Sequence, residues 1–141
     1  MEAILDKTFV ESLIPQKTPF VMVDKLLYFA ENAITAGLTI PAGNIFVKDG
    51  RFTEPGIIEH MAQSVALYTG YQFYLKQEPA PTGYIGSIKE VTVLNLPFTG
   101  DELITEVNVL QEFMGITLVD IVTRCNDTEI AKSQMKTVLA K

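Results

Sequence analysis

A glutamate lies inside an apolar stretch of this sequence, where a packed helix would normally carry an aliphatic side chain. Glu59 follows Ile57 and Ile58 and precedes Met61 and Ala62. A carboxylate in apolar surroundings costs several kcal/mol unless it is paired or takes up a proton. Because both outcomes suit acid–base chemistry, Glu59 is the first candidate catalytic residue.

Glu59 has a polar neighbour at helical spacing. Gln63 lies four residues further along, and Ala66 and Gly70 continue the same helix face. The small residues on this face leave room for a ligand or let the sheet approach closely, and Gln63 is a candidate substrate-binding residue. In the alternative interpretation, Glu59 is a partly exposed acid of the first helical turn, favoured by the helix dipole.

His60 is the only histidine of the chain. It is adjacent to Glu59, so the two side chains diverge by about 100° on a helix and cannot both face one small substrate. The simpler interpretation is a helical residue that is paired with a neighbour or half exposed. As a catalytic residue, His60 would have to act across a subunit interface.

The elements that must position these residues follow from the patterning. Residues 8–13 are expected to form a short helix, and Pro55 begins a long one, with Thr53 or Glu54 as its cap, that runs to about Leu75. Strand formers at 20–29 and 33–40 predict a hairpin, followed by a loop over 41–53. Four further strands are expected at 83–94, 102–113, 116–125 and 129–139.

This order predicts a single α+β domain over residues 1–141. In it, an antiparallel sheet of about six strands, the last four in a meander, wraps around one long central helix; a generic α+β sandwich is the alternative. The net charge of −6 argues against nucleic acid as a partner. One His and one Cys, Cys125, give no metal-ligand spacing, and no cofactor is expected. The single Cys and the lack of an apolar run of ~20 residues predict a cytoplasmic protein with no membrane span.

Two segments resemble a known family. Residues 55–63, PGIIEHMAQ, resemble the central-helix motif of the hotdog-fold β-hydroxyacyl-acyl-carrier-protein dehydratases, which typically reads PGVLIIEAMAQ. Residues 14–24, IPQKTPFVMVD, are similar to that family's opening motif, LPHRYPFLLVD. A variant branch associated with aryl-polyene-type pigment pathways is closer still, since its helix motif reads like GIEYMAQ. The resemblance implies the hotdog fold and an acyl thioester, on acyl carrier protein or CoA, as substrate.

The chain departs from the family at the histidines. The family's loop motif GHFPG supplies a His that removes the proton next to the thioester carbonyl, while the helix Glu protonates the departing hydroxyl. Here the nearest match, residues 50–53, puts Arg51 in that place, and Gln16 replaces the His of the opening motif. Arginine stays protonated and cannot act as a general base, so Arg51 is a candidate substrate-binding residue instead.

Three functions are consistent with these residues. The first is dehydration of a 3-hydroxyacyl thioester, with Glu59 as acid, His60 or Glu59 itself as base, and the N–H groups of the first helical turn, at Gly56 and Ile57, on the thioester oxygen. The second is thioester hydrolysis with Glu59 as the base that activates water. The third is a non-catalytic subunit that binds acyl chains. Hotdog proteins of this kind are usually dimers, so a homodimer, or a dimer with a related subunit, is expected.

Overall fold

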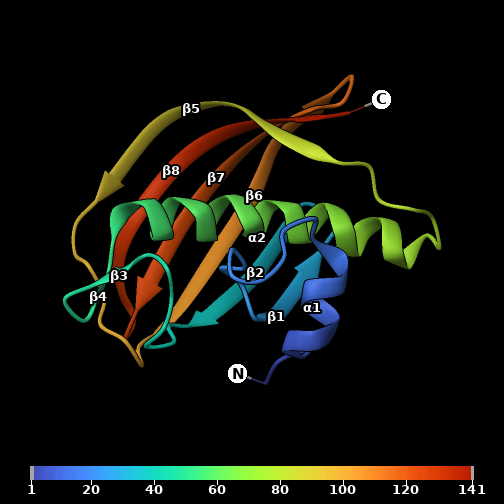
Figure 1. Cartoon of the computed structure of the whole chain (residues 1–141). Coiled ribbons are helices and arrows are strands. Elements are labelled where there is room, and N and C mark those ends of the chain that lie inside the picture. The colour runs from blue at the N-terminus through green and yellow to red at the C-terminus, as the bar shows by residue number, and fades with distance from the viewer. Residues whose placement is uncertain (1, 141) are drawn as a thin grey trace.

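A computed structural model describes residues 2–140, in which a curved sheet packs around one long helix (Figure 1). The long helix is α2 (Glu54–Leu75), with Pro55 in its first turn as the sequence predicts. The expected cap residue, Thr53, donates its hydroxyl to Phe46 O instead of capping the helix with its side chain. A six-stranded antiparallel sheet packs on this central helix, which confirms the hotdog fold expected from the resemblance.

The sheet contains six strands, and five of the six predicted strands match their observed bounds closely. In spatial order the strands are β1 (Lys25–Ala30), β2 (Ala33–Thr39), β6 (Glu102–Phe113), β7 (Ile116–Cys125), β8 (Thr128–Leu139) and β5 (Gly83–Val93). The predicted meander is wrong in one respect. β6, β7 and β8 are consecutive neighbours, but β5 crosses to the far edge and pairs with β8, and β6 pairs with β2.

The two edges of the sheet differ. The start of the chain covers β1, because the N–H groups of Ile4 and Leu5 donate to Leu26 O at 2.7 and 3.4 Å. β5 pairs with β8 alone among the described residues. The outer edge of β5 therefore leaves unpaired backbone groups, the arrangement that favours pairing with another chain.

Two predicted segments differ from the structure. The strand expected from residue 20 begins only at Lys25, because the backbone of Met22 binds side chains of α2 and not a neighbouring strand. The expected loop over 41–53 contains a short hairpin of β3 (Val47–Lys48) and β4 (Arg51–Phe52), which turns at Gly50 with φ 77°. The predicted first helix is confirmed as α1 (Lys7–Leu13).

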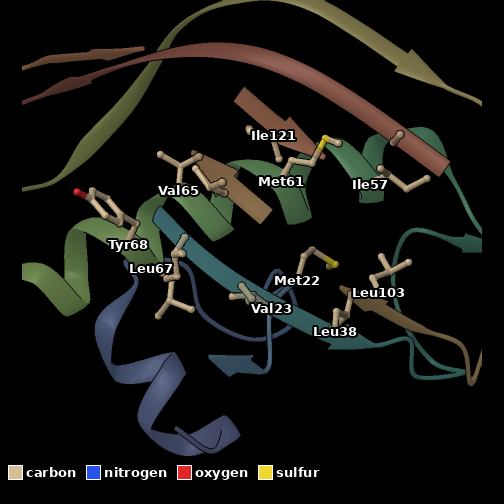
Figure 2. Close-up of a cluster of buried hydrophobic side chains, with 14 of the residues drawn as sticks. Met22, Val23, Leu38, Ile57, Met61, Val65, Leu67, Tyr68, Leu103 and Ile121 are labelled. Carbon is tan, nitrogen blue, oxygen red and sulfur yellow. The ribbon is translucent and has the colours of Figure 1, made fainter. Parts of the chain in front are cut away.

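The core lies between α2 and the sheet (Figure 2). Ile57, Met61 and Val65 of α2 are buried there, close to Leu103 and Ile121 of the sheet. Burial extends around much of the helix, and only a narrow strip stays half-buried. This strip includes Glu59, Ala62, Ala66 and Thr69. It recurs at helical spacing, so these side chains share one face that the core covers only in part.

Candidate active site

A cavity of about 440 Å³ lies along the half-buried strip of α2. Its wall opposite α2 consists of the segment after α1, which includes Gln16, and the beginning of β5, which includes Tyr84. Glu59, Ala66 and Gly70 line it from α2. Among the described residues, Glu59 is the only carboxylate in the lining, and Tyr84 is the only other titratable side chain. The cavity can therefore hold a ligand that has both apolar and polar parts, with one carboxylate beside it.

Gln63 fixes the orientation of Glu59. The Gln63 amide oxygen accepts the N–H of Met22 at 2.6 Å, so its nitrogen must point the other way. That nitrogen donates to Phe20 O at 2.8 Å and to Oε1 of Glu59 at 3.0 Å. Because the amide N–H needs an acceptor, a proton carried by Glu59 belongs on Oε2. Gln63 is buried and is absent from the lining, so its place is behind Glu59 rather than in the cavity.

His60 does not reach the cavity. The side chain is fully buried, with Nδ1 2.6 Å from Met22 O and Nε2 2.7 Å from Thr105 Oγ1. A carbonyl oxygen only accepts, so Nδ1 carries the hydrogen and Nε2 of the neutral ring accepts the Thr105 hydroxyl. Thr123 Oγ1, 2.7 Å from Thr105 Oγ1, extends the chain of hydrogen bonds into β7. The ring thus joins α2 to the sheet.

The surroundings of His60 keep the ring neutral. Burial lowers the pKa of His60 from 6.5 to about 4, because the charged imidazolium loses its hydration there. The hydrogen bond to Met22 O opposes this shift but is the smaller influence. A fully engaged, neutral imidazole inside the core suits a structural role within its own subunit. A catalytic role for His60 stays a prediction that this geometry does not favour.

The two candidates in the first turn of α2 lie away from the cavity. Gly56 is buried under the 41–53 segment, and a Cβ there would lie 2.5 Å from Cε1 of Phe52 and 2.8 Å from the Cβ of Phe46. Ile57 is fully buried in the core. Neither residue lines the cavity. A ligand in this cavity would therefore not bring its thioester oxygen into contact with Gly56 or Ile57.

Arg51 also lies outside the lining. Its guanidinium is 4.3 Å from the centroid of the Phe98 ring, and Nη1 donates to Leu96 O at 3.3 Å. The side chain is exposed beside the first turn of α2. This position holds the short hairpin against the segment before β6. It does not bring a charge next to Glu59, so substrate binding by Arg51 stays a prediction.

The small residues of the expected stripe have two different roles. Ala66 lines the cavity, as a site for a ligand requires. Gly70 also lines it, but a Cβ at Gly70 would collide with Leu13 O. The close approach expected at this face is therefore made by α1 and not by the sheet. By fixing the end of α1, Gly70 also sets the position of the cavity wall that follows.

The far wall of the cavity was not anticipated from single residues. Gln16, Thr82 and Tyr84 carry no local pattern that distinguishes a lining residue. The resemblance at residues 14–24 was the available signal, since it marked the Gln16 segment as part of a motif. Among residues 2–140, no group of three or more His, Cys, Asp or Glu side chains could hold a metal ion. The described helices include none that is long and apolar enough to cross a membrane.

Comparison with protein families gives one match over nearly the whole chain. The family described as ApeP-like, ApeP dehydratase, matches residues 8–140. A 3-hydroxyacyl-[acyl-carrier-protein] dehydratase FabZ of Vibrio cholerae is 30% identical over 139 residues, which cover 92% of this chain and 88% of the relative. An uncharacterized thioester dehydrase of Halalkalibacterium halodurans is 29% identical over 147 residues, covering 96% and 93% of the two chains.

Solved structures show the same fold. The dehydratase heterocomplex ApeI:P from Xenorhabdus doucetiae superimposes with a TM-score of 0.87 at 18% identity, covering 94% of this chain and 91% of that one. A hypothetical thioesterase with coenzyme A from Streptococcus pneumoniae has a TM-score of 0.66 at 8% identity, with 82% and 84% covered. At these identities the likeness concerns the fold, which dehydratases and thioesterases share.

Proposed function

The chain belongs to the ApeP-like family of dehydratases, and we propose that it acts in the dehydration of a 3-hydroxyacyl thioester carried on an acyl carrier protein. The observation that carries this proposal is Glu59. Among residues 2–140 it is the one carboxylate that lines the cavity, and Gln63 holds it in a single orientation. An oriented carboxyl group next to an acyl-sized cavity is what protonation of a leaving hydroxyl requires.

In the proposed reaction Glu59 is the general acid. A base removes a proton from C2 of the substrate, the C2–C3 double bond forms, and the C3–O bond breaks. Glu59 Oε2 gives its proton to the departing hydroxyl, which leaves as water. Glu59 then regains a proton, and the base loses one, before the next turnover. Gln63 remains bound to Oε1 throughout and keeps Oε2 toward the substrate.

We propose that the base comes from a second, related subunit. His60 is enclosed in its own core, and a second copy of the chain would enclose its own His60 in the same way. Among residues 2–140 the lining holds no histidine, lysine or cysteine, and besides Glu59 its only titratable group is the phenol of Tyr84. A pair of unlike subunits supplies the missing base, and a heterocomplex is what the Xenorhabdus structure is named as.

The open edge of β5 is the proposed contact for that subunit. β5 has backbone groups without a strand partner on one side, and Ile85 and Ile88 are 41% and 43% exposed. Tyr84 and Ile85 also line the cavity. A second strand laid along β5 would therefore cover apolar side chains and close the cavity on that side. The subunit contact and the candidate active site would then share residues of β5.

The test uses the protein isolated from its native host, so that a natural partner subunit stays bound. The preparation is incubated with 3-hydroxyacyl carrier protein, and mass spectrometry follows the loss of one water from the acyl group. The wild type is expected to form the enoyl product, and Glu59→Gln is expected to lower the rate by about 10² or more, as for loss of a general acid. An unchanged rate in Glu59→Gln would contradict the proposed role.

Thioester hydrolysis is the second candidate, because one observation favours it. A single carboxylate in the lining is enough to activate water, whereas dehydration needs a second group. Release of free thiol from acyl thioesters, lost in Glu59→Gln, would support hydrolysis by this chain. The same experiment separates the third possibility: a subunit that only binds acyl chains would give neither enoyl product nor thiol, alone or with its partner.

A further inference from the structure

We propose that Gln16 is a further substrate-positioning residue of the cavity, and that its amide oxygen accepts the 3-hydroxyl of the bound acyl group. This inference rests on the proposed function and assigns a residue that would bind the 3-hydroxyl of its substrate. Two glutamines belong to this site: Gln63, which binds the carboxylate of Glu59, and Gln16, which lines the same cavity as Glu59. Their hydrogen bonding differs, and this difference is the basis of the proposal.

The amide oxygen and nitrogen of Gln63 both have hydrogen-bond partners within the chain. Its oxygen accepts the N–H of Met22, and its nitrogen donates to Phe20 O and Glu59 Oε1. The oxygen of Gln16, by contrast, is inaccessible and has no hydrogen-bond partner among the described residues. A buried acceptor without a donor costs about 1–3 kcal/mol, so a side chain serving the fold alone would not be expected to leave it so.

The backbone around Gln16 is held in place. Lys17 Nζ donates to Glu11 O at 2.9 Å and to Ile14 O at 3.1 Å, which ties the segment to the end of α1. Phe20 N donates to Lys17 O at 2.8 Å, and Phe20 O is bound by Gln63. The segment therefore keeps Gln16 in the cavity wall, and the remaining freedom lies in the side chain.

The terminal amide of Gln16 can rotate. The last torsion of a glutamine is broad and roughly two-fold, so half a turn brings the oxygen to the side where the nitrogen was. Because Gln16 lines the same cavity as Glu59, this oxygen can then accept a donor from a ligand. A 3-hydroxyl is such a donor, and its oxygen is the atom that Glu59 is proposed to protonate. A plain acyl chain offers no donor there.

The experiment compares two inert probes on the complete protein with any partner bound. The probes are pantetheine amides of 3-hydroxyoctanoic acid and octanoic acid, in which nitrogen replaces the thioester sulfur, and calorimetry measures both affinities. The wild type is expected to prefer the hydroxylated probe by roughly tenfold, the value of one hydrogen bond. Gln16→Met is expected to bind both probes equally, and Gln16→His, whose ring can accept a hydrogen bond, should keep the preference.

Thermal unfolding supplies the readout that does not depend on substrate. Since the Gln16 oxygen has no partner to lose, Gln16→Met should unfold at the wild-type temperature or above it. Gln111→Met, the same change on the exposed outer side of β6, is the matched control and should alter neither stability nor preference. A clear loss of stability in Gln16→Met, or a hydroxyl preference that survives it, would overturn the proposal. A wild type that binds both probes alike would also overturn it, whereas binding of neither probe would reject the acyl-thioester function itself.

Discussion

Glu59 and Met22 are joined through a single side chain, that of Gln63. Its amide oxygen binds the Met22 N–H at 2.6 Å, and its nitrogen binds Glu59 Oε1 at 3.0 Å. The carbonyl of Met22 is bound in turn by His60 Nδ1 at 2.6 Å. Both backbone groups of one residue are thus held by α2, and the carboxylate is oriented by the same contacts. The geometry of the site therefore depends on residues that never touch the cavity.

Replacing Gln63 is expected to impair the site through Glu59. Gln63→Met removes the donor to Glu59 and leaves the Met22 N–H buried without an acceptor. We expect stability to fall by about 1–3 kcal/mol and the dehydration rate to fall by about tenfold. Urea unfolding and the enoyl assay measure the two effects.

The same substitution in the Glu59→Gln variant tests whether Gln63 affects the rate by orienting Glu59. In Glu59→Gln the carboxylate is already absent, so Gln63→Met should add little to the loss of rate while keeping its full effect on stability. Equal additional losses of rate in both backgrounds would mean that Gln63 does not act by orienting Glu59. Gln134→Met, on the outer side of β8, is the control for the side-chain change.

His60 predicts a dependence of stability on pH. Burial holds the pKa of His60 at about 4 in the folded chain, below the value of 6.5 for a free side chain. As the pH falls, the unfolded chain therefore takes up this proton first, and the folded state is disfavoured between about pH 6.5 and 4. Through this group alone, the folded state is expected to be about 3 kcal/mol less stable below pH 4 than above pH 6.5.

Urea unfolding at about pH 7 and about pH 4.5 measures this loss. Because carboxylates also titrate in this window, the comparison is with His60→Gln, which should lose less stability on acidification than the wild type. As the chain has one histidine, its imidazole can also be followed by NMR without assignment of others. Titration of that signal near 6.5 in the folded protein would contradict the burial argument.

The sequence specified the elements better than the contacts between them. The bounds of β6 and β7 could be predicted exactly because alternating residues and turns mark them locally. The place of β5 could not, since its pairing with β8 is a long-range choice that no local pattern contains. Glu59 was predicted as the site residue from its apolar surroundings. The sequence predicts substrate binding for Gln63 because it shares a helix face with Glu59. It does not reveal that the backbone groups of Met22 and Phe20 occupy the Gln63 amide.

Gly70 is expected to tolerate no side chain. A Cβ there would collide with Leu13 O, a backbone atom that cannot move without shifting the end of α1. We expect Gly70→Ala to destabilise the fold by about 1–3 kcal/mol, as overpacking does, and to weaken binding of the acyl probes by displacing the wall that follows α1. Gly43→Ala is the control, because a Cβ at Gly43 meets nothing within 4 Å. Similar unfolding midpoints for the two variants would refute the close approach.

The open edge of β5 predicts how the chain associates. Ile88 is 43% exposed on this edge strand, and a lysine there would place a charge against any strand that pairs with β5. We expect light scattering to show the wild type as a dimer, with itself or with a related subunit, and Ile88→Lys as a monomer. The control is Met114→Lys at the β6–β7 turn, where the side chain is 84% exposed and β8 lies between this hairpin and β5. If Ile88→Lys remains dimeric while Met114→Lys dissociates, the contact lies at the hairpin and not along β5. Since Tyr84 and Ile85 belong to both the edge and the cavity lining, loss of the dimer should also weaken binding of the acyl probes.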